Sequence, residues 1–245
     1  MNRFGAFLVH LGISLIIFAG LAALVLFVWY PDFFFAADGG WEGIRIIILV
    51  DLVAGPLLTL IVYNRDKPSL RTDLAIIAVF QAACLTAGTY VVYSERPLAL
   101  VYVDGRFTSM AADDYTAYGV DVPDLSHLPG IGPKQVAVEM PDDPEQQAEI
   151  RRYGIANRVP LRAMVDRYQP LTYAALRVER EAFDQDALRQ RDAETGQIDV
   201  WLDTHGGELA DYAFFPFATR YEYVFLGVSK AQEQIVGLLR TPAPL

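Results

Sequence analysis

The residue of clearest chemical interest is Asp51, a carboxylate within a long apolar stretch of the chain. A charged side chain inside a membrane is costly and faces a bundle interior or a partner, so Asp51 could bind a partner or relay ions. A second interpretation puts Asp51 one turn inside the outer interface, where the carboxylate reaches water. Arg45 is six residues away, which is not the spacing of a helical ion pair. The sequence leaves both interpretations open.

Polar and helix-breaking residues accompany Asp51 in the same region. Gly55-Pro56 removes a backbone donor and predicts a kink, which membrane helices tolerate where neighbours supply hydrogen bonds. Gln81 is an amide in an apolar segment, and it either joins two helices or contacts a ligand. We therefore expect a partner-binding site formed by Asp51, Gly55, Pro56, Thr59 and Gln81, with Thr86 and Thr89 as further hydrogen-bond donors.

Nothing in the sequence argues for catalysis. The histidines are His10, His127 and His205, and no two of them share the spacing of metal ligands. His127 and His205 each follow a hydroxyl residue, but adjacency in sequence is not the geometry of a catalytic triad. The single cysteine, Cys84, excludes a disulfide within the chain. We expect a protein that is not an enzyme, with no catalytic residues, no metal and no cofactor.

The elements that carry these residues are three apolar stretches, predicted as transmembrane helices over about residues 4–30, 46–63 and 74–93. A helix of about 20 apolar residues crosses a hydrocarbon core about 30 Å thick. The first stretch is too long for a signal peptide, and no small-residue cleavage pattern follows it. We therefore predict a three-helix membrane module over residues 1–95.

The placement of Lys and Arg predicts the orientation of this module. Arg3 precedes the first helix, and three more Lys or Arg residues lie in the loop at 64–73. The connection between the first two helices is acidic apart from Arg45. Because cytoplasmic loops carry the excess of positive charge, we expect a cytoplasmic N-terminus in a bacterial inner membrane. Three crossings then put residues 96–245 in the periplasm.

The part of the chain after the third stretch is acidic. Residues 95–245 carry 15 of the 20 Lys and Arg and 24 of the 30 Asp and Glu, a net charge of −9. Such a surface repels nucleic acid, so we expect no nucleic-acid partner.

The same part is predicted as an α+β domain with a mainly antiparallel sheet. Asp104-Gly105 between two β-forming runs, 98–103 and 106–109, is a strong hairpin signal. Further strands are expected at 135–140, 197–202, 213–217, 220–229 and 234–240. Helices are expected from Pro144 with Asp142 as its N-cap, at 160–168, and, as the longest, at 173–193.

Two groups of residues carry a family resemblance. The first is Val50-Asp51-Leu52, Gly55-Pro56-Leu57-Leu58-Thr59-Leu60, Lys67, Asp73-Leu74, Gln81 and Arg96-Pro97. The second is Phe214-Phe215-Pro216-Phe217, Arg220 and Gly237-Leu238-Leu239. In these residues the chain resembles the TfpX/TfpZ-type family of type IV pilin accessory proteins, densely over 50–97 and thinly between 110 and 210.

The resemblance implies a non-enzymatic inner-membrane chaperone paired with a cognate type IV pilin and needed for pilus assembly or twitching motility. Membrane lipid is the other expected partner, and the pilus assembly platform is a further candidate. We hypothesise that Asp51 and Gly55-Pro56 form a polar notch for the amino end or the buried glutamate of the pilin helix. An ionised glutamate there would be repelled by an ionised Asp51, so the pairing needs an amine or a protonated carboxyl.

Two other functions stay open on the sequence. One is a small transporter or proton-relay subunit that uses Asp51, Gln81 and His10, although no inverted repeat is visible. The other is a membrane-anchored periplasmic enzyme, for which no specific constellation of residues is found.

Overall fold

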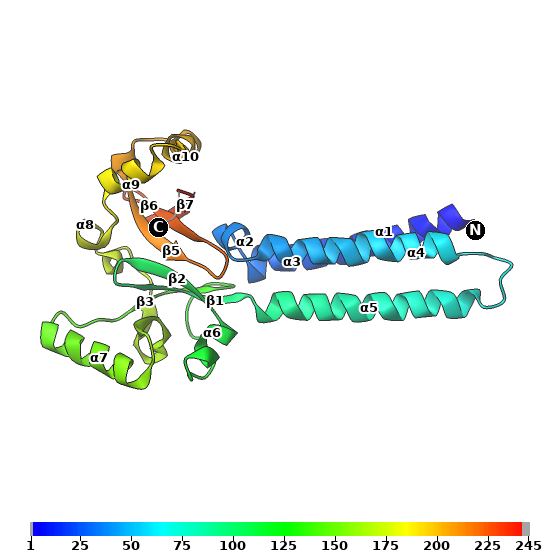
Figure 1. Ribbon diagram of the computed structural model, residues 1–245, viewed down its shortest axis with the longest axis horizontal. Helices are drawn as coiled ribbons and strands as arrows, with labels where there is room; N and C mark the ends of the chain where they lie inside the picture. Colours follow the sequence, from blue (N-terminus) through cyan, green and yellow to red (C-terminus); the bar gives the residue numbers. More distant parts are fainter. Residues whose placement is uncertain (1, 242–245) are drawn as a thin grey trace. The chain divides into compact units, whose positions relative to one another are not determined.

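The computed structural model describes residues 2–241, and the chain divides after Arg96 into two compact units (Figure 1). The first unit is helical and the second is built on a sheet. Each unit is described by itself.

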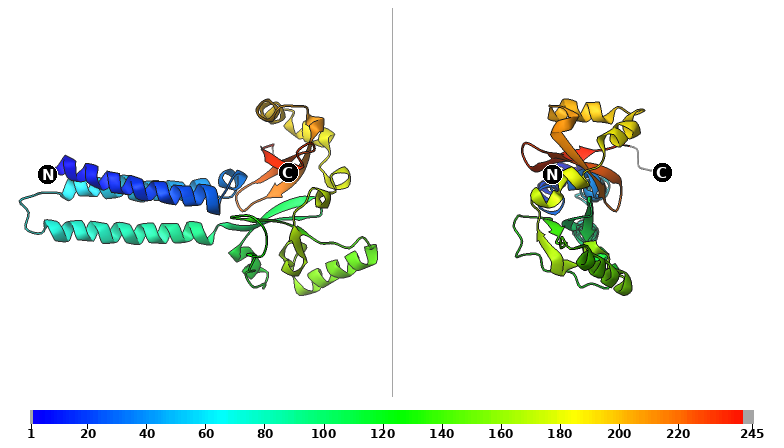
Figure 2. Two further views of the ribbon diagram at one scale, coloured as in Figure 1. Left: turned by 180° about the vertical axis from the view of Figure 1, so that it is seen from behind. Right: turned by 90° about the vertical axis from the view of Figure 1, so that its left-hand side faces the viewer.

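The first unit consists of three long helices that lie side by side (Figure 2). Helix α1, Arg3–Leu24, continues into a π-helical segment, Val25–Trp29. After the short helix α2, Phe33–Ala37, the second long helix runs through α3, Gly40–Ile47, a π-helical segment, Ile48–Ala54, and α4, Gly55–Val62. Helix α5, Leu70–Ser94, is the third.

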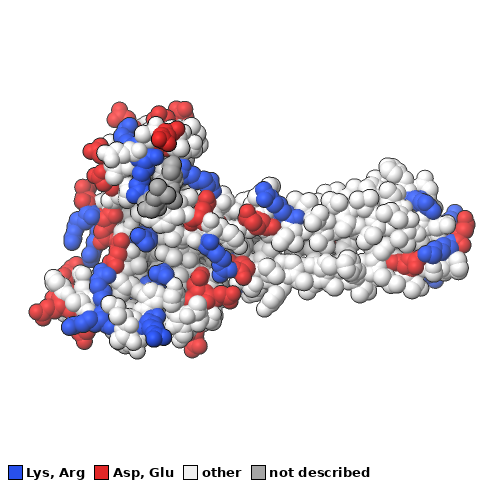
Figure 3. Space-filling model, viewed as in Figure 1, with Lys and Arg blue, Asp and Glu red and all other residues white. Residues whose placement is uncertain are grey.

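All three helices are long and apolar enough to cross a membrane, with mean hydropathies of 2.8, 2.3 and 1.8. Figure 3 shows that the surface of the three-helix bundle is almost free of charged residues between its two ends. This agrees with their composition, because a helix whose outer face is apolar all round is suited to lipid rather than to water. The three expected membrane helices are therefore confirmed as candidate spans.

The second candidate span begins earlier than the sequence predicted, at Gly40 rather than at 46. The sequence prediction began after Glu42 because this charged residue interrupts the apolar run. Glu42 nevertheless suits the first turn of a helix, where negative charge is favourable. Asp51 is consequently the twelfth of 23 residues, the midpoint of the helix, and only 1% of its surface is exposed. The interpretation in which the Asp51 carboxylate reaches water is wrong, because the neighbouring helices bury it.

The second unit contains one seven-stranded sheet with the order β4-β3-β1-β2-β5-β6-β7. The strands are β1 Pro97–Val103, β2 Arg106–Ala111, β3 Lys134–Val138, β4 Tyr168–Pro170, β5 Tyr212–Ala218, β6 Tyr223–Ser229 and β7 Gln234–Leu239. Only the pairs β1–β3 and β2–β5 are parallel, so the predicted mainly antiparallel sheet is confirmed. Asp104 and Gly105 both have positive φ, 52° and 69°, as the predicted two-residue hairpin requires.

Helices and short turns cover the sheet. The helices are α6 Ala112–Ala117, α7 Pro144–Asn157, α8 Val178–Glu181, α9 Gln185–Asp192 and α10 Gln197–His205. Short 3-10 turns lie at Leu161–Ala163, Val165–Arg167, Ala174–Leu176 and Leu209–Asp211. One core cluster packs around Met110, Tyr115 and Val136, and another around Trp201 and Phe214. Met110 of the first cluster and Phe214 of the second lie on the same face of the sheet, which these helices and turns cover.

Four expected elements differ from the structure. The helix expected at 160–168 is replaced by two 3-10 turns, Leu161–Ala163 and Val165–Arg167. The long helix at 173–193 is broken into a 3-10 turn, α8 and α9, because Arg177 has a left-handed φ of 43° and Asp184 caps a new helix through Ala187 N–H. Residues 197–202 form α10 rather than a strand, and its Ile198 and Trp201 turn inward at helical spacing. The N-cap of α7 is Asp143, which accepts from Glu145 N–H, and not Asp142.

Candidate functional site

The three long helices are joined by five polar side chains, which we call the polar cluster: His10 and Ser14 of α1, Asp51, Thr59 of α4, and Gln81 of α5. His10 and Ser14 are four residues apart, so a single face of α1 presents both. Asp51 lies in the π-helical segment Ile48–Ala54, and such segments often occur at functional sites in helices. Each long helix contributes at least one member.

Gln81 is the centre of the polar cluster because its amide reaches both of the other helices. Its Nε2 donates to Asp51 Oδ1 at 2.5 Å, with further contacts at 3.3 Å to Ser14 Oγ and to the Asp51 carbonyl. Its Oε1 lies 2.8 Å from His10 Nε2. One side chain therefore links α1 to the middle of the second long helix.

The hydrogen bonds fix the polarity of the network. A carboxylate oxygen accepts, so the nitrogen of the Gln81 amide faces Asp51 and its oxygen faces His10. His10 Nε2 must then carry a proton, and Nδ1 exchanges a hydrogen bond with Thr59 Oγ1 at 2.6 Å. Ser14 Oγ donates to Asp51 Oδ1 at 3.0 Å. These bonds form a continuous path from Asp51 to Thr59.

Four members of the polar cluster are buried, with 1% of Ser14, 1% of Asp51, 4% of Thr59 and 9% of Gln81 exposed, and His10 is half-buried. Within residues 2–241, Asp51 Oδ2 is buried and has no hydrogen-bond partner. An unpaired polar atom in an apolar interior is costly, and most such atoms find partners. Asp51 Oδ2 is thus the one acceptor atom of this carboxylate that a further donor could still satisfy.

Gly55 and Pro56 take part through packing. A Cβ built on Gly55 would lie 2.2 Å from Gln81 Oε1, so only glycine leaves room for the amide at this position. Pro56 has no N–H, and the helix continues through it because Gly55 N–H bonds the carbonyl of Val50, five residues earlier. The pair is buried against the bundle rather than open as a notch.

The structure thus brings together Asp51, Gly55, Thr59 and Gln81 from the predicted set, with Pro56 in the next helical position. Thr86 and Thr89 are not part of the polar cluster, since no hydrogen bond joins either to it within residues 2–241. Ser14 was missed, and His10 was considered only for ion relay. The available signal was two polar residues at helical spacing in an otherwise apolar run.

In the sheet unit the described residues contain no group of three or more His, Cys, Asp or Glu side chains that could hold a metal ion. His205 instead contacts two carbonyl oxygens, those of Trp201 at 2.8 Å and Val236 at 3.2 Å, and stacks on the Trp201 ring. This histidine is engaged in packing α10 against β7.

Three candidate membrane spans tied by a buried polar cluster and followed by a sheet unit define a class of membrane-anchored protein. Within that class, a family model described as fimbrial assembly protein FimB matches residues 1–34. The chain is 34% identical over 96 residues to the fimbrial assembly protein of serogroups C1 and C2 from Dichelobacter nodosus, over 38% of this chain and 73% of the relative. The chain therefore belongs to the fimbrial assembly protein family, and the resemblance to pilus assembly accessory proteins is confirmed.

Other members of the family match over different lengths. The serogroup I protein of D. nodosus is 29% identical over 145 residues, which are 58% of this chain and 56% of the relative. The serogroup E1 protein is 32% identical over 96 residues, which are 38% of this chain and 37% of the relative. The match therefore spans only about half of the length of the serogroup I protein. No solved structure matches the chain.

Proposed function

We propose that this protein is an inner-membrane accessory protein that supports pilus assembly by binding its cognate type IV pilin. The names of its relatives, fimbrial assembly proteins, support the assembly role. The observation that carries the proposal is the buried polar cluster, which holds three apolar helices in one fixed arrangement. A preformed helical surface binds another apolar helix with little loss of conformational freedom.

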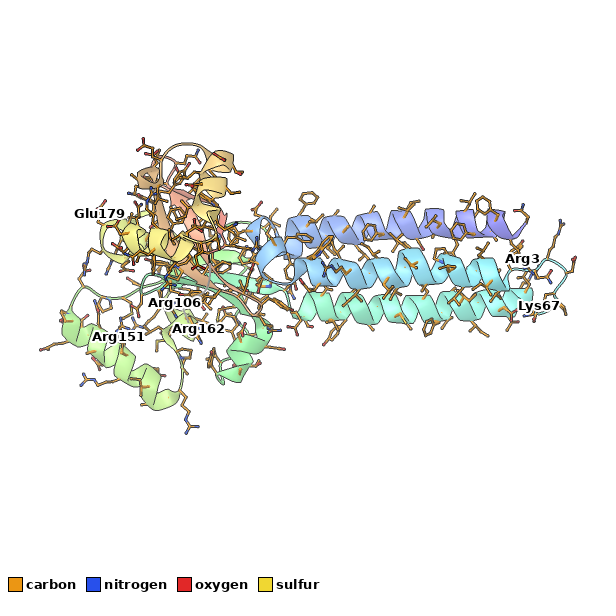
Figure 4. The ribbon with its side chains drawn as sticks, turned by 45° about the horizontal axis from the view of Figure 1, so that its top comes forward. Arg3, Lys67, Arg106, Arg151, Arg162 and Glu179 are labelled. Atoms are coloured by element: carbon orange, nitrogen blue, oxygen red, sulfur yellow. The ribbon has the colours of Figure 1, made fainter. Side chains whose placement is uncertain are left out.

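The proposed orientation has a cytoplasmic N-terminus and a periplasmic sheet unit. Arg3 and Lys67 lie at the same end of the three-helix bundle (Figure 4). At the opposite end Tyr93 contacts Trp29, with ring centroids 5.3 Å apart, and Arg96 covers the Tyr93 ring at 3.6 Å. Lys and Arg favour the cytoplasmic side, and aromatic rings favour the interfaces. The sheet unit would then face the head of a pilin whose apolar helix is in the membrane.

The proposal keeps a partner-binding role for five residues of the bundle but moves the contact from an open notch to one oxygen of Asp51. The residues are Asp51, Gly55, Pro56, Thr59 and Gln81. In the closed bundle these residues satisfy one another, so the pilin helix does not fill an open notch. Asp51 Oδ2 remains without a donor in the described structure. A pilin amine or protonated carboxyl that reached this oxygen would complete the hydrogen bonding of a buried carboxyl group.

The network gives no support to proton relay. Within residues 2–241, the side chain that links His10 to Asp51 is the Gln81 amide, which neither gains nor loses a proton readily. A path of hydrogen bonds that passes through an amide joins helices but conducts protons poorly. The polar cluster is therefore better suited to structure and binding.

Co-purification of the tagged full-length protein with its pilin in mild detergent tests the proposal. We expect pilin to be recovered with the wild type and cells lacking the protein to lose surface pili. Asp51→Asn should lower pilin recovery, whereas Thr86→Val, on an exposed α5 position outside the polar cluster, should not. Absence of pilin from the wild-type eluate together with normal piliation of the deletion strain would refute the function. Equal recovery with Asp51→Asn would refute only the role of Asp51.

A further inference from the structure

Arg45 is a charged residue within the second candidate membrane span that the polar cluster does not use. It is the sixth residue of the span Gly40–Val62, and its side chain is exposed. A charged side chain that faces lipid is costly and usually marks a contact with a partner. The proposed orientation also puts this end of the helix on the outer side, where arginine is not favoured. The position of Arg45 therefore calls for an anion at the membrane surface.

The Arg45 guanidinium lies at the depth where the hydrocarbon core ends. Its Cζ is 5.0 Å from the centre of the Trp41 ring, which is one helical turn nearer the start of the span. Trp41 precedes Asp51, the midpoint of the span, by ten residues, or about 15 Å along a helix. Half of a hydrocarbon core about 30 Å thick has the same length. The Arg45 side chain therefore extends out of the hydrocarbon to the level of the lipid headgroups.

The nearby carboxylate of Glu42 does not pair with Arg45. Both residues are exposed on α3, but within residues 2–241 no ion pair joins them. Successive helical residues are 100° apart, so Trp41 and Glu42 flank Arg45 on opposite sides. The guanidinium lies over Trp41 and is thus turned away from Glu42. Its N–H groups are available to an anion from outside the chain.

The helix face that carries Arg45 continues into the membrane as apolar side chains. Leu49 and Val53 follow Arg45 at intervals of four residues, and both are exposed. Residues at this spacing share one face of a helix. The face therefore has an aromatic ring and one cationic group at the membrane surface and apolar side chains below them. A phospholipid has its phosphate and its acyl chains in the same order.

We infer that Arg45 binds the phosphate of an anionic phospholipid, whose acyl chain packs on Leu49 and Val53. Guanidinium groups bind phosphate oxygens through paired, charge-assisted hydrogen bonds. An anionic lipid fits better than a zwitterionic one, because the amine of a zwitterionic headgroup repels the guanidinium. The lipid matches this face in charge and in depth. The inference requires the three helices to lie in a membrane but does not require binding of a pilin.

Quenching of tryptophan fluorescence by brominated lipids tests this site in the full-length protein. Trp29→Phe leaves Trp41 as the tryptophan of the three helices, and the buried Trp201 of the sheet unit gives a constant background. Phosphatidylcholine nanodiscs receive increasing fractions of dibrominated phosphatidylglycerol or dibrominated phosphatidylcholine. We expect the anionic lipid to have the higher association constant at Trp41. Arg45→Gln should lower this constant about fivefold, the effect of one basic group on an anionic lipid.

Arg71→Gln is the matched control for the loss of one positive charge. Arg71 is exposed near the start of α5, and within residues 2–241 it is not stacked on an aromatic ring. This variant should change the association constant less than twofold. Glu42→Gln should raise the constant, because it removes a negative charge beside the bound phosphate. Circular dichroism verifies that each variant keeps its helix content.

A comparison with inorganic phosphate distinguishes a lipid from a free anion. Inorganic phosphate should lower the quenching no more than sodium chloride does at equal ionic strength. Displacement of the lipid by inorganic phosphate would overturn the inference. So would equal quenching by the two brominated lipids, equal effects of Arg45→Gln and Arg71→Gln, or a lower constant for Glu42→Gln.

Discussion

At the scale of single residues, the polar side chains that are most costly to bury in an apolar helix bundle form hydrogen bonds with one another. Asp51 sits at the midpoint of its helix, and Gln81 donates to it from α5. Hydrogen bonds between membrane helices contribute about 0.6–2 kcal/mol each in measured cases. Several such bonds that meet at one amide therefore give a local but specific contribution to how the three helices pair.

Gly55 and Gln81 form the most testable contact of the polar cluster. Gly55→Ala puts a Cβ 2.2 Å from Gln81 Oε1, so the amide must move and its bonds to His10 and Asp51 weaken. We expect a loss of about 1–3 kcal/mol in the unfolding free energy of the bundle, the usual cost of overpacking. Titration with SDS, followed by tryptophan fluorescence, measures it.

A double-mutant cycle separates this contact from a general effect of alanine. In a Gln81→Ala background the clash is absent, so Gly55→Ala should cost little there. Gly12→Ala is the matched control, because a Cβ at Gly12 meets nothing within 4 Å. Equal costs of Gly55→Ala in both backgrounds would contradict the contact.

Because of two buried tyrosines, we expect the unfolding free energy of the sheet unit to fall at alkaline pH. Tyr115 and Tyr168 share a hydrogen bond of 3.0 Å, and Tyr168 donates to the Arg162 carbonyl. Burial raises the pKa of Tyr115 to about 12 and also raises the pKa of Tyr168. The unfolded chain releases these protons near pH 10, whereas the folded chain keeps them. Their contribution is therefore complete below pH 10 and is lost as the pH rises toward 12 and beyond.

We expect the unfolding free energy to fall by up to about 2–3 kcal/mol per tyrosine between pH 10 and 12. Denaturant titrations at several pH values, followed by near-ultraviolet circular dichroism, measure this. The variant with Tyr115→Phe and Tyr168→Phe should be less stable at pH 8 but lose less stability above pH 10. Parallel pH profiles for the two proteins would disprove the assignment.

At the scale of elements, sequence patterns predicted the strands and the apolar helices better than the polar helices. The hairpin was recoverable because Asp104-Gly105 specifies both its turn type and its register. The break in the helix expected at 173–193 could not be predicted from the sequence. It depends on a long-range hydrogen bond from Phe183 N–H to the Phe214 carbonyl, which holds the chain extended there. Residues 197–202 alternate in hydrophobicity as a strand does, yet packing of Trp201 against Phe214 favours the helix.

The same limit applied to the candidate site. Asp51 and Gln81 stood out because charge and amide groups are rare in apolar helices. Their pairing with Ser14 and His10 depends on how the three helices are rotated against one another, which no local pattern encodes. Ser14 in particular cannot be recognised as a site residue from the sequence, because its role depends on Asp51 of another helix.

A matched pair of glycine substitutions is available in the sheet unit, at Gly105 in the hairpin between β1 and β2 and at Gly119 after α6. Gly105 has φ of 69°, and a Cβ there would lie 2.8 Å from the Glu181 carbonyl oxygen. Gly119 has φ of 70°, but its Cβ would meet nothing within 4 Å. Gly119→Ala should cost only the left-handed conformation, about 1 kcal/mol, and Gly105→Ala clearly more. Thermal unfolding of both variants measures the difference, and equal melting temperatures would exclude the contact.

At the scale of the whole molecule, the single cysteine makes the proposed topology directly measurable. Cys84→Ser removes the native thiol, and a new cysteine then replaces either Asp66, between the second and third long helices, or Ala148 of α7. Both positions are exposed. A membrane-impermeant maleimide should label the cysteine at 148 in intact spheroplasts and the cysteine at 66 only after lysis. The reverse pattern would place the sheet unit in the cytoplasm.

The aspartate at the centre of the second long helix also bears on how the chain is made. Entering lipid with an aspartate at that depth costs about 2.5–3.5 kcal/mol, and the amide that relieves it is carried by the following helix. A nascent chain that has emerged only as far as Tyr63 therefore holds this carboxyl group without the amide that hydrogen-bonds to it. The second and third helices should leave the insertion machinery together as one hairpin. A truncated chain ending before Leu70 should therefore insert its second helix less efficiently than a chain that includes α5, and an insertion assay with both lengths measures the difference.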